Sequence, residues 1–460
     1  VRRLLENGAN SSFVNQIVDN TVPPEVVAAD PFAALSGSPI KIPDGPNLFM
    51  PDRRNSMGFD ITHTGTLAQI DAARDPFASH RWHAAPLTVI PVSGASRDIL
   101  NPADPTDVVG SVITAPPDSV HHAFDMAQPW QAPAQDRARI LNAAADLFEA
   151  RYGQIFALLA REAGKTLADA VGEMREAVDF LRYYATQAGD TAPAGTFVCI
   201  SPWNFPLAIF SGQIGAALAA GNAVLAKPAE QTPLIAHLAV SCLYEAGVPR
   251  SALQLLPGDG QIGAALTCDG RADGVAFTGS TQTAQRIRAS LAEHGTPGTP
   301  LIAETGGLNA MIVDSTALPE QAVRSIIQSA FQSAGQRCSA LRCLYLQHDI
   351  APAFTEMLIG AMDALNIGTP WTLANDIGPV IDDAARADIQ SHIATARAEG
   401  RVVHSLKTPA TGTYVAPTLI RLGGISDLMR EIFGPVLHIA TFKSHELDRV
   451  IDDINATGYG

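Results

Sequence analysis

Cys338 is the residue whose neighbours in the sequence best suit nucleophilic chemistry. It lies in residues 331–342 (FQSAGQRCSALR), between a glycine-containing turn and a small polar residue, and it follows a helical pattern that begins at Glu320. A thiolate is the strongest nucleophile among ordinary side chains at neutral pH. Free cysteine is also among the most buried residue types, so this position alone favours a packed core thiol. The nucleophile hypothesis therefore requires partner groups elsewhere in the chain.

Two polar residues at predicted strand ends are candidates for those partners. Asn204 lies in a strand-exit loop, ISPWNFP, and a side-chain amide is a neutral donor suited to an oxyanion. Glu304 ends a predicted strand and precedes Gly306 and Gly307, which permit close backbone approach. In apolar surroundings its carboxyl would have a raised pKa and would serve as a general base. The simpler interpretations are a turn asparagine and a solvent-exposed glutamate.

A literal G-x-G-x-x-G lies in LLPGDGQIGAAL, with its glycines at Gly258, Gly260 and Gly263. Such a pattern between a strand and a helix is typical of dinucleotide binding. The acidic residue expected about twenty positions later is missing, since Thr281, Gln282 and Thr283 stand there. We therefore interpret these glycines as a tight strand-to-helix turn.

Other segments offer better groups for a dinucleotide. Gly279 and Ser280, in FTGST, open a predicted helix, where backbone N–H groups and the helix dipole favour a pyrophosphate. Lys227 and Glu230 follow a predicted strand, where a cation and a carboxylate suit ribose hydroxyls. Their simpler interpretation is a solvated loop pair. The segment EIFGPV adds a carboxylate for a ribose and an aromatic wall, at Glu431 and Phe433.

Composition sets the class of protein. With 460 residues, 47% of them hydrophobic and 17% charged, the chain is expected to form a globular protein of two or more domains. Its net charge of −15 argues against a nucleic-acid partner, which requires clustered Lys and Arg.

The five cysteines form no C-x-x-C pair, which argues against a disulfide framework or a zinc site and favours a reducing cytoplasm. No metal site is expected. Residues 200–226 lack charged residues, but their prolines, glycines, Gln213 and Asn222 favour a strand, a buried helix and a second strand over a membrane span.

The hydrophobic pattern predicts an α/β fold. Residues 95–115 are typical of a hairpin, and residues 119–187 show helical periodicity. From about residue 193 buried strands alternate with helices, which indicates βαβ units and a parallel sheet. Residues 21–94 are rich in Pro, Asp and Gly and predict an extended arm or linker.

Six segments in one order, PWNFP, KPAEQ, FTGS, ETGG, GQRC and EIFGP, resemble the motif series of the NAD(P)-dependent aldehyde dehydrogenase superfamily. The resemblance implies a Rossmann-like NAD-binding domain and an α/β catalytic domain that is incomplete at its C-terminal end. It implies that Cys338 is the nucleophile, Asn204 an oxyanion donor and Glu304 the general base. The implied NAD contacts are Trp203, Lys227, Glu230, Gly279, Ser280, Thr305, Gly306, Glu431 and Phe433.

Segments outside these motifs, including VRRLLENGANSSFVNQIVD and DRRNSMGFD, resemble the bifunctional proline utilisation A (PutA) family. That resemblance implies oxidation of L-glutamate γ-semialdehyde to glutamate. It divides the chain into the end of an FAD-dependent proline dehydrogenase (β/α)8 barrel (1–20), a linker (21–94), the NAD-binding domain (95–306) and the catalytic domain (307–460).

The same resemblance implies the residues that bind substrates. Phe205 and Ser339 would contact the semialdehyde. Arg2 and Arg3 would grip the proline carboxylate in the barrel, a role suited to guanidinium groups.

The PutA resemblance also carries expectations about the whole protein. It implies a cytoplasmic homo-oligomer with substrate channelling and peripheral membrane association. Since relatives continue beyond NATGYG and the run GDTAPAG is short, we expect the sequence to be part of a longer protein. Two alternatives stay open: an aldehyde dehydrogenase for another semialdehyde or aliphatic aldehyde, and a catalytically silent binding protein. Loss of Cys338 or Glu304 would mark the latter, and both residues are present.

Overall fold

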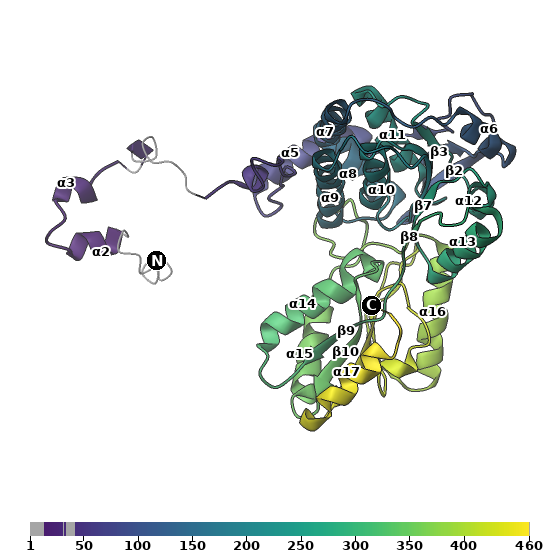
Figure 1. Cartoon of the computed structure of the whole chain (residues 1–460). Coiled ribbons are helices and arrows are strands. Elements are labelled where there is room, and N and C mark those ends of the chain that lie inside the picture. The colour runs from purple at the N-terminus through teal and green to yellow at the C-terminus, as the bar shows by residue number, and fades with distance from the viewer. Residues whose placement is uncertain (1–12, 31, 34–41, 460) are drawn as a thin grey trace.

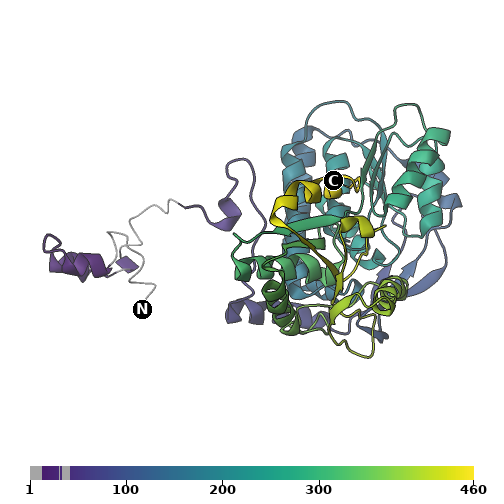
Figure 2. The same ribbon diagram turned by 90° about the horizontal axis from the view of Figure 1, so that it is seen from below.

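The computed structural model of the chain describes residues 13–30, 32–33 and 42–459. Arg2 and Arg3 lie outside the described residues. Two short helices, α2 (Phe13–Val18) and α3 (Pro24–Val27), lie apart from the main body in both Figure 1 and Figure 2. The main body contains two five-stranded sheets, and the candidate site depends on how these meet.

The first sheet has the strand order β6-β5-β4-β7-β8, and all of its pairings are parallel. Its strands are β4 (Thr196–Ile200), β5 (Ala223–Lys227), β6 (Leu253–Leu255), β7 (Gly274–Thr278) and β8 (Leu301–Glu304). The connecting helices are α10 (Ala208–Ala219), α11 (Pro233–Ala246), α12 (Gly260–Cys268) and α13 (Thr281–His294). The inner strands are almost wholly buried, as expected for a parallel sheet with both faces covered.

A helical layer packs against the helices that connect these strands. It consists of α6 (Asp118–Met126), α7 (Ala134–Ala150), α8 (Tyr152–Glu162) and α9 (Leu167–Thr186). The hairpin of β2 (Ser96–Asn101) and β3 (Asp104–Ile113) is antiparallel, and β1 (Trp82–Ala84) pairs with β3 in parallel. The helices and the hairpin were both predicted from periodicity and are confirmed.

Residues 21–94 differ from the expected extended arm. They contain the helices α5 (Thr64–Arg74), η1 (Gly45–Asn47) and η2 (Asp75–Phe77), as well as β1. Ile70 and Trp82 belong to the main hydrophobic core, with exposed fractions of 1% and 7%. This part of the segment is therefore folded and not extended, because a few apolar side chains among many turn residues anchor it to the core.

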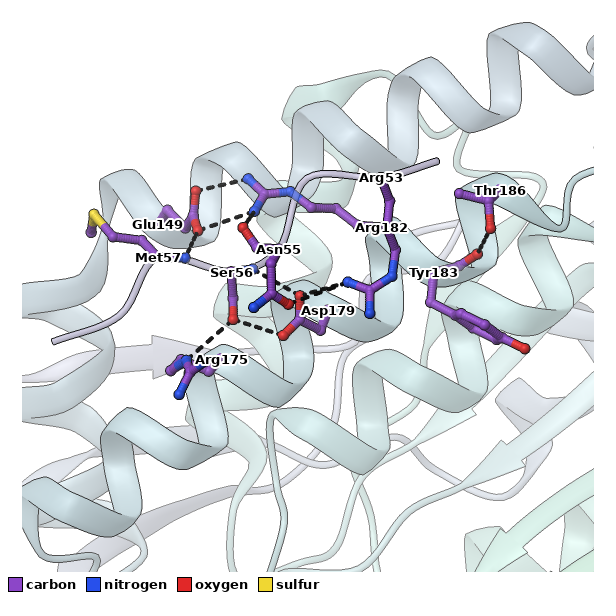
Figure 3. A network of polar contacts seen from close by, with 10 residues as sticks. All are labelled: Arg53, Asn55, Ser56, Met57, Glu149, Arg175, Asp179, Arg182, Tyr183 and Thr186. Carbon is purple, nitrogen blue, oxygen red and sulfur yellow. Dashed lines mark hydrogen bonds and ion pairs between the residues drawn. The ribbon is translucent and has the colours of Figure 1, made fainter. Parts of the chain in front are cut away.

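Residues 53–57 are bound to α7 and α9 by a polar network (Figure 3). The Asp179 carboxylate accepts hydrogen bonds from the Ser56 backbone N–H at 2.8 Å and the Ser56 hydroxyl at 2.7 Å, and from Arg53 Nη1 at 3.2 Å. Arg182, which is 2% exposed, donates to the Asn55 carbonyl and to the Glu149 carboxylate. We call residues 53–57 the strap.

The second sheet has the order β11-β12-β13-β10-β9, with only the β11–β12 pairing antiparallel. Its strands are β9 (Asn309–Val313), β10 (Leu341–Gln347), β11 (Val402–Ser405), β12 (Thr418–Arg421) and β13 (Val436–Phe442). The accompanying helices are α14 (Pro319–Phe331), η3 (Gln332–Gly335), α15 (Ala351–Asp363), α16 (Asp383–Ala398), η4 (Ile425–Asp427), η5 (Ser444–Glu446) and α17 (Leu447–Asn455). The α/β prediction is confirmed for both sheets.

Two buried carboxylates cap helices of the first sheet. Both oxygens of Glu162 accept backbone N–H bonds from Leu234 and Ile235, at the start of α11. One oxygen of Glu173 accepts from Leu207 and Ala208, at the start of α10. The first N–H groups of a helix have no partner within it, so these carboxyl oxygens supply the missing acceptors. The ends of α8 and α9 thereby fix where the next two helices begin.

The chain passes from one sheet to the other between Glu304 and Asn309. Figure 1 shows β8 leading from the half that contains α10 and α11 into the half that contains β9 and β10. The parallel strands of the first sheet end at one edge, and β9 and β10 begin opposite it, so loops from both sheets meet there. In α/β proteins this edge is where ligands bind.

The structure also bears on residues 200–226. They form the end of β4, then α10 and β5, as predicted. Within the described part of the chain, no helix has the length and apolar character needed to cross a membrane.

Candidate active site

Cys338 lies in the loop between η3 and β10, and its residue is exposed. The end of η3, which leads into this loop, contains three successive residues in the left-handed region: Ser333 at φ 54°, Ala334 at φ 53° and Gly335 at φ 67°. Only Gly335 is of the type that adopts this conformation without cost, since each L-residue in it costs about 1–2 kcal/mol. Contacts from elsewhere must hold this turn.

Gln336 supplies several of those contacts. Its side-chain Oε1 accepts from the Ile381 backbone N–H at 2.9 Å, and its Nε2 donates to the Ser333 carbonyl at 3.1 Å. The Gln336 carbonyl accepts from the Asn204 amide Nδ2 at 3.2 Å. Asn204 is buried in the loop after β4. The predicted oxyanion donor is thus bonded to the loop that carries the predicted nucleophile, two residues before Cys338. We call residues 336–340 the nucleophile loop.

The turn after β8 contacts the other side of the same loop. Asn309 Nδ2 donates to the carbonyls of Cys338 at 2.7 Å and Ala340 at 2.8 Å. A Cβ on Gly307 would lie 3.3 Å from the Cys338 carbonyl oxygen, which is tighter than ordinary contact. The absence of a side chain at Gly307 therefore lets the turn that carries Glu304 approach the nucleophile loop.

Glu304 departs from the prediction in one respect. Its carbonyl accepts from the Gly279 N–H at 3.1 Å, so its backbone is fixed to the β7 side of the sheet. The residue itself is exposed, as are Ile302 and Ala303. The expected apolar surroundings were wrong, because β8 is an edge strand whose side chains no further strand covers.

A cavity of about 640 Å³ opens at the carboxyl edge of the first sheet. This size is ordinary for a cofactor pocket. The predicted cofactor residues that line it are Trp203, Lys227, Glu230, Gly279 and Ser280. Thr305, Gly306, Glu431 and Phe433 are not among its lining residues.

Lys227 is a buried cation in the wall of this cavity, which Arg286 also lines. The residue is 4% exposed, and its Nζ donates to the Pro228 carbonyl at 2.9 Å and lies 3.9 Å from the Glu230 carboxylate. Burial lowers the pKa of Lys227, while Glu230 and Asp259 oppose that shift. An ammonium group has three donors. The remaining ones suit the phosphate or ribose oxygens of a dinucleotide.

Ser280 forms the other end of the cavity. It is the N-cap of α13, and its hydroxyl accepts from the Thr283 N–H at 3.2 Å. A helix start of this kind attracts anions. The buried cation, the helix start and the cavity volume together fit the NAD(P) that the motif series implies.

The interpretation of the G-x-G-x-x-G run is incomplete. Gly258 does form a tight turn, since a Cβ there would lie 2.3 Å from Ile262 Cγ1. However, Gly260 and Gly263 line the cavity. A Cβ on Gly263 would meet the Lys227 side chain at 3.6 Å. These two glycines therefore leave space beside the cavity's lysine as well as making the turn.

Glu431 and Phe433 do not line the cavity, and their partners are other residues of the site. Phe433 meets Trp203 edge to face, with ring centroids 5.5 Å apart. Glu431 forms an ion pair with Arg342 at 2.8 Å. Burial raises the pKa of Glu431, and the Arg342 guanidinium opposes that shift. The structure thus gives Glu431 a protein partner where the sequence predicted a ribose ligand.

Phe205 lies between two cations. Lys165 Nζ lies 4.6 Å from its ring centroid, and the Arg337 guanidinium lies 5.7 Å from it. Lys165 is itself paired with buried Glu173 at 3.2 Å. Ser339, predicted to contact substrate, is exposed beside Cys338.

Sequence reasoning missed Arg342, Gln336 and Lys165. The position of Arg342 could have indicated its role, because it is a charged residue near the start of the mostly apolar strand LRCLYLQ. A charge buried in such a strand requires polar partners. Gln336 and Lys165 carried none, because their contacts are made with segments distant in sequence. Across residues 13–30, 32–33 and 42–459 there is no group of three His, Cys, Asp or Glu side chains that could hold a metal ion.

Comparison with known proteins agrees with this geometry. The model of the aldehyde dehydrogenase family matches residues 91–460. The chain belongs to the aldehyde dehydrogenase family. This confirms the resemblance in the motif series and the predicted fold class.

Two kinds of aldehyde dehydrogenase relative are found. The bifunctional protein PutA of Klebsiella aerogenes is 49% identical over 494 residues, which cover all of this chain and 38% of that protein. The 1-pyrroline-5-carboxylate dehydrogenase of Anoxybacillus flavithermus is 36% identical, with 78% of this chain and 76% of the relative covered. The chain thus spans well under half the length of its PutA relative.

Solved structures give the same two kinds. A crystal structure of bifunctional proline utilization A (PutA) matches with a TM-score of 0.83 and 44% identity, over all of this chain and 46% of that one. A 1-pyrroline-5-carboxylate dehydrogenase from Thermus with bound NAD matches with a TM-score of 0.81 and 29% identity, over 87% and 84% of the two chains.

Proposed function

We propose that this chain catalyses the NAD-dependent oxidation of L-glutamate γ-semialdehyde to L-glutamate, the second step of proline catabolism. The observation that carries the proposal is the contact of the Cys338 loop with Asn204 on one side and, on the other, with Asn309, which follows the turn after Glu304. The likeness to PutA and to separate 1-pyrroline-5-carboxylate dehydrogenases over the same region supports the choice of substrate.

In the proposed reaction the Cys338 thiolate attacks the aldehyde carbon and forms a thiohemiacetal. The oxyanion is held by the Asn204 amide and the Cys338 backbone N–H; donors of this kind are worth about 3–4 kcal/mol each in other enzymes. NAD, when bound, accepts the hydride that leaves the thiohemiacetal carbon. Glu304 then removes a proton from water, which attacks the resulting thioester and releases glutamate and the Cys338 thiol.

The cofactor is proposed to be NAD. Lys227 and Ser280 would hold it in the cavity, together with Trp203, Glu230 and Gly279. The Glu230 carboxylate would repel the 2′-phosphate of NADP, which favours NAD. Glu431, Phe433, Thr305 and Gly306 would approach its nicotinamide end.

The substrate end of the site is proposed to include Phe205 and Ser339. The Phe205 ring, with the cations Lys165 and Arg337 beside it, would contact the aliphatic chain of the semialdehyde and leave positive charge near its carboxylate. Ser339 would donate to the same carboxylate from the other side of Cys338.

The wider context is also a proposal. We infer that the chain is part of a bifunctional protein with a FAD-dependent proline dehydrogenase barrel, of which residues 1–20 are the end and in which Arg2 and Arg3 bind proline. The same proposal includes the domain boundaries at 21–94, 95–306 and 307–460. It also includes a cytoplasmic homo-oligomer that associates peripherally with a membrane.

Steady-state kinetics with the full-length protein test the reaction. Glutamate γ-semialdehyde should give a higher kcat/KM for NADH formation than succinate semialdehyde or aliphatic aldehydes, and Cys338→Ala should abolish NADH formation. A preference for the other aldehydes would refute the proposed substrate and indicate an aldehyde dehydrogenase of different specificity. Full activity of Cys338→Ala would refute the mechanism.

A further inference from the structure

Arg342 is the most completely bonded buried charge near the candidate site. Its residue is 0% exposed. Nη1 donates to the carbonyls of Gly335 at 2.7 Å and Gly434 at 3.2 Å. Nη2 donates to the Arg337 carbonyl at 2.9 Å and to Glu431 Oε1 at 2.8 Å, and Nε donates to the same oxygen at 3.2 Å. All three nitrogens of the guanidinium are therefore engaged.

Two of these partners lie immediately before Cys338. Arg342 binds the carbonyls of Gly335 and Arg337, and the carbonyl between them, that of Gln336, accepts from Asn204. Three successive carbonyls are thus fixed from two directions. Such anchoring is what the left-handed turn at residues 333–335 requires, because without it the loop would relax to a cheaper conformation.

The Glu431 carboxylate extends the contact to the turn after Glu304. The Gly307 backbone N–H opposes the raising of the Glu431 pKa that burial causes, and a Cβ on Gly306 would lie 1.9 Å from Glu431 Oε2. Arg342 and Glu431 therefore join the nucleophile loop to the turn that carries the proposed base. A charged guanidinium also attracts the Cys338 thiolate, which opposes the lowering of the Arg342 pKa that burial causes.

We propose that Arg342 is a positioning residue, which holds the Cys338 loop and, through Glu431, the Glu304 turn at the separation that both halves of the reaction need. This inference rests on the proposed function, because it takes Cys338 as the nucleophile and Glu304 as the base. A lysine cannot replace the guanidinium, since a single ammonium cannot reach four acceptors on two segments.

The test compares Arg342→Lys with wild type in the full-length protein. Misplacement of a reacting group by about 1 Å costs roughly 100-fold. We therefore expect a kcat for NADH formation lower by about that factor. The rate of Cys338 alkylation by iodoacetamide, measured without cofactor, should fall as well, whereas the KM for NAD should change less than kcat.

Glu431→Gln is a second variant for the case in which Arg342→Lys does not fold. It keeps an acceptor for the guanidinium and removes the charge. Slower alkylation of Cys338 without cofactor is expected, and that measurement is independent of any role of Glu431 in holding NAD.

Arg182→Lys is the matched control. Arg182 is equally buried, at 2% exposed, and binds a carbonyl and two carboxylates on the strap side of the molecule. It should lower Tm without changing the alkylation rate.

Three outcomes would overturn the proposal: unchanged kcat and alkylation in Arg342→Lys, equal changes in Arg342→Lys and Arg182→Lys, or unchanged alkylation in Glu431→Gln. NADH formation by Cys338→Ala would instead refute the proposed function itself, which separates the two failures.

Discussion

Asn204 and Glu304 act at different stages of the proposed reaction, although both lie next to one loop. Asn204 is buried and already donates to the Gln336 carbonyl, so its amide is held in place before substrate arrives. Glu304 is exposed at a strand end. The structure therefore predicts separable losses when each is changed.

Asn204→Ala should reduce kcat by about 100- to 1,000-fold, the effect of deleting one oxyanion donor in other enzymes. The KM for NAD should change little, because Asn204 does not line the cofactor cavity. Steady-state kinetics at saturating NAD measure both quantities. An Asn204→Ala variant with normal kcat would assign the amide to holding the loop alone.

Glu304→Gln should leave a burst of NADH equal to the enzyme concentration and then slow or abolish turnover. The amide cannot accept the proton of the attacking water, so the thioester on Cys338 would accumulate. Stopped-flow absorbance at the NADH band, with quenched-protein mass measurement of the acyl group, tests this. Loss of the burst itself would place Glu304 before the thioester step.

At the residue scale, the sequence predicted where Cys338, Asn204 and Glu304 lie in the fold better than it predicted their surroundings. The hydrophobic periodicity predicts the strands and helices that end at or just before Cys338, Asn204 and Glu304. The sequence therefore allows the expectation that these residues lie at the same edge of a sheet. The exposure of Glu304 and the Arg342 partner of Glu431 could not, because both depend on strand order and on the packing of β10 against β13. Strand order is set by contacts between segments that are distant in sequence, so local sequence patterns do not reveal it.

The left-handed turn at residues 333–335 is the element on which the candidate site depends most. Gly335→Ala would add a Cβ 2.2 Å from the Gly434 carbonyl oxygen, in a residue at φ 67°. The left-handed conformation alone should cost about 1–2 kcal/mol of unfolding free energy, and displacement of the loop should slow Cys338 alkylation. Denaturant unfolding and alkylation rates measure the two effects.

Gly360→Ala is the control for that substitution. Gly360 lies within α15, and a Cβ there would meet nothing within 4 Å. It should raise the unfolding free energy by about 0.5–1 kcal/mol, as alanine does in a helix interior, and leave alkylation unchanged. Equal effects at both positions would contradict the importance of the turn.

The cap of α11 predicts a pH dependence. Burial raises the pKa of the Glu162 carboxyl from its ordinary 4.5 to about 8, while the N–H groups of Leu234 and Ile235 oppose the shift. A raised pKa means that the folded state keeps a proton that the unfolded state loses. The contribution to stability is full below pH 4.5 and is lost as the pH rises toward 8.

Glu162→Gln should therefore flatten the decline of the unfolding free energy between pH 4.5 and 8. It should also lower stability at the acid end of that range, since one backbone N–H loses its acceptor. Denaturant titrations at several pH values test both effects. A slope identical to wild type would mean that Glu162 is ionised throughout.

At the scale of the whole molecule, the strap fastens the N-terminal segment to the helical layer. Asp179→Ala would remove three hydrogen bonds to Arg53 and Ser56. Because Ser56 is then buried without an acceptor, the free energy of unfolding should fall by about 1–3 kcal/mol. Limited proteolysis should then cut within residues 42–60 faster than in wild type. Asp136→Ala, which removes an exposed ion pair with Arg139 and a carboxylate in the first turn of α7 but no contact with the strap, is the control.

The buried caps of α10 and α11 also imply an order of assembly. Once α10 and α11 are buried away from water, their first N–H groups depend on the carboxyl groups of Glu173 and Glu162, which are carried by α9 and α8. The helical layer, which precedes the sheet in the chain, would thus be the template on which the cofactor half condenses. In a kinetic experiment, loss of either carboxylate should slow refolding more than it speeds unfolding.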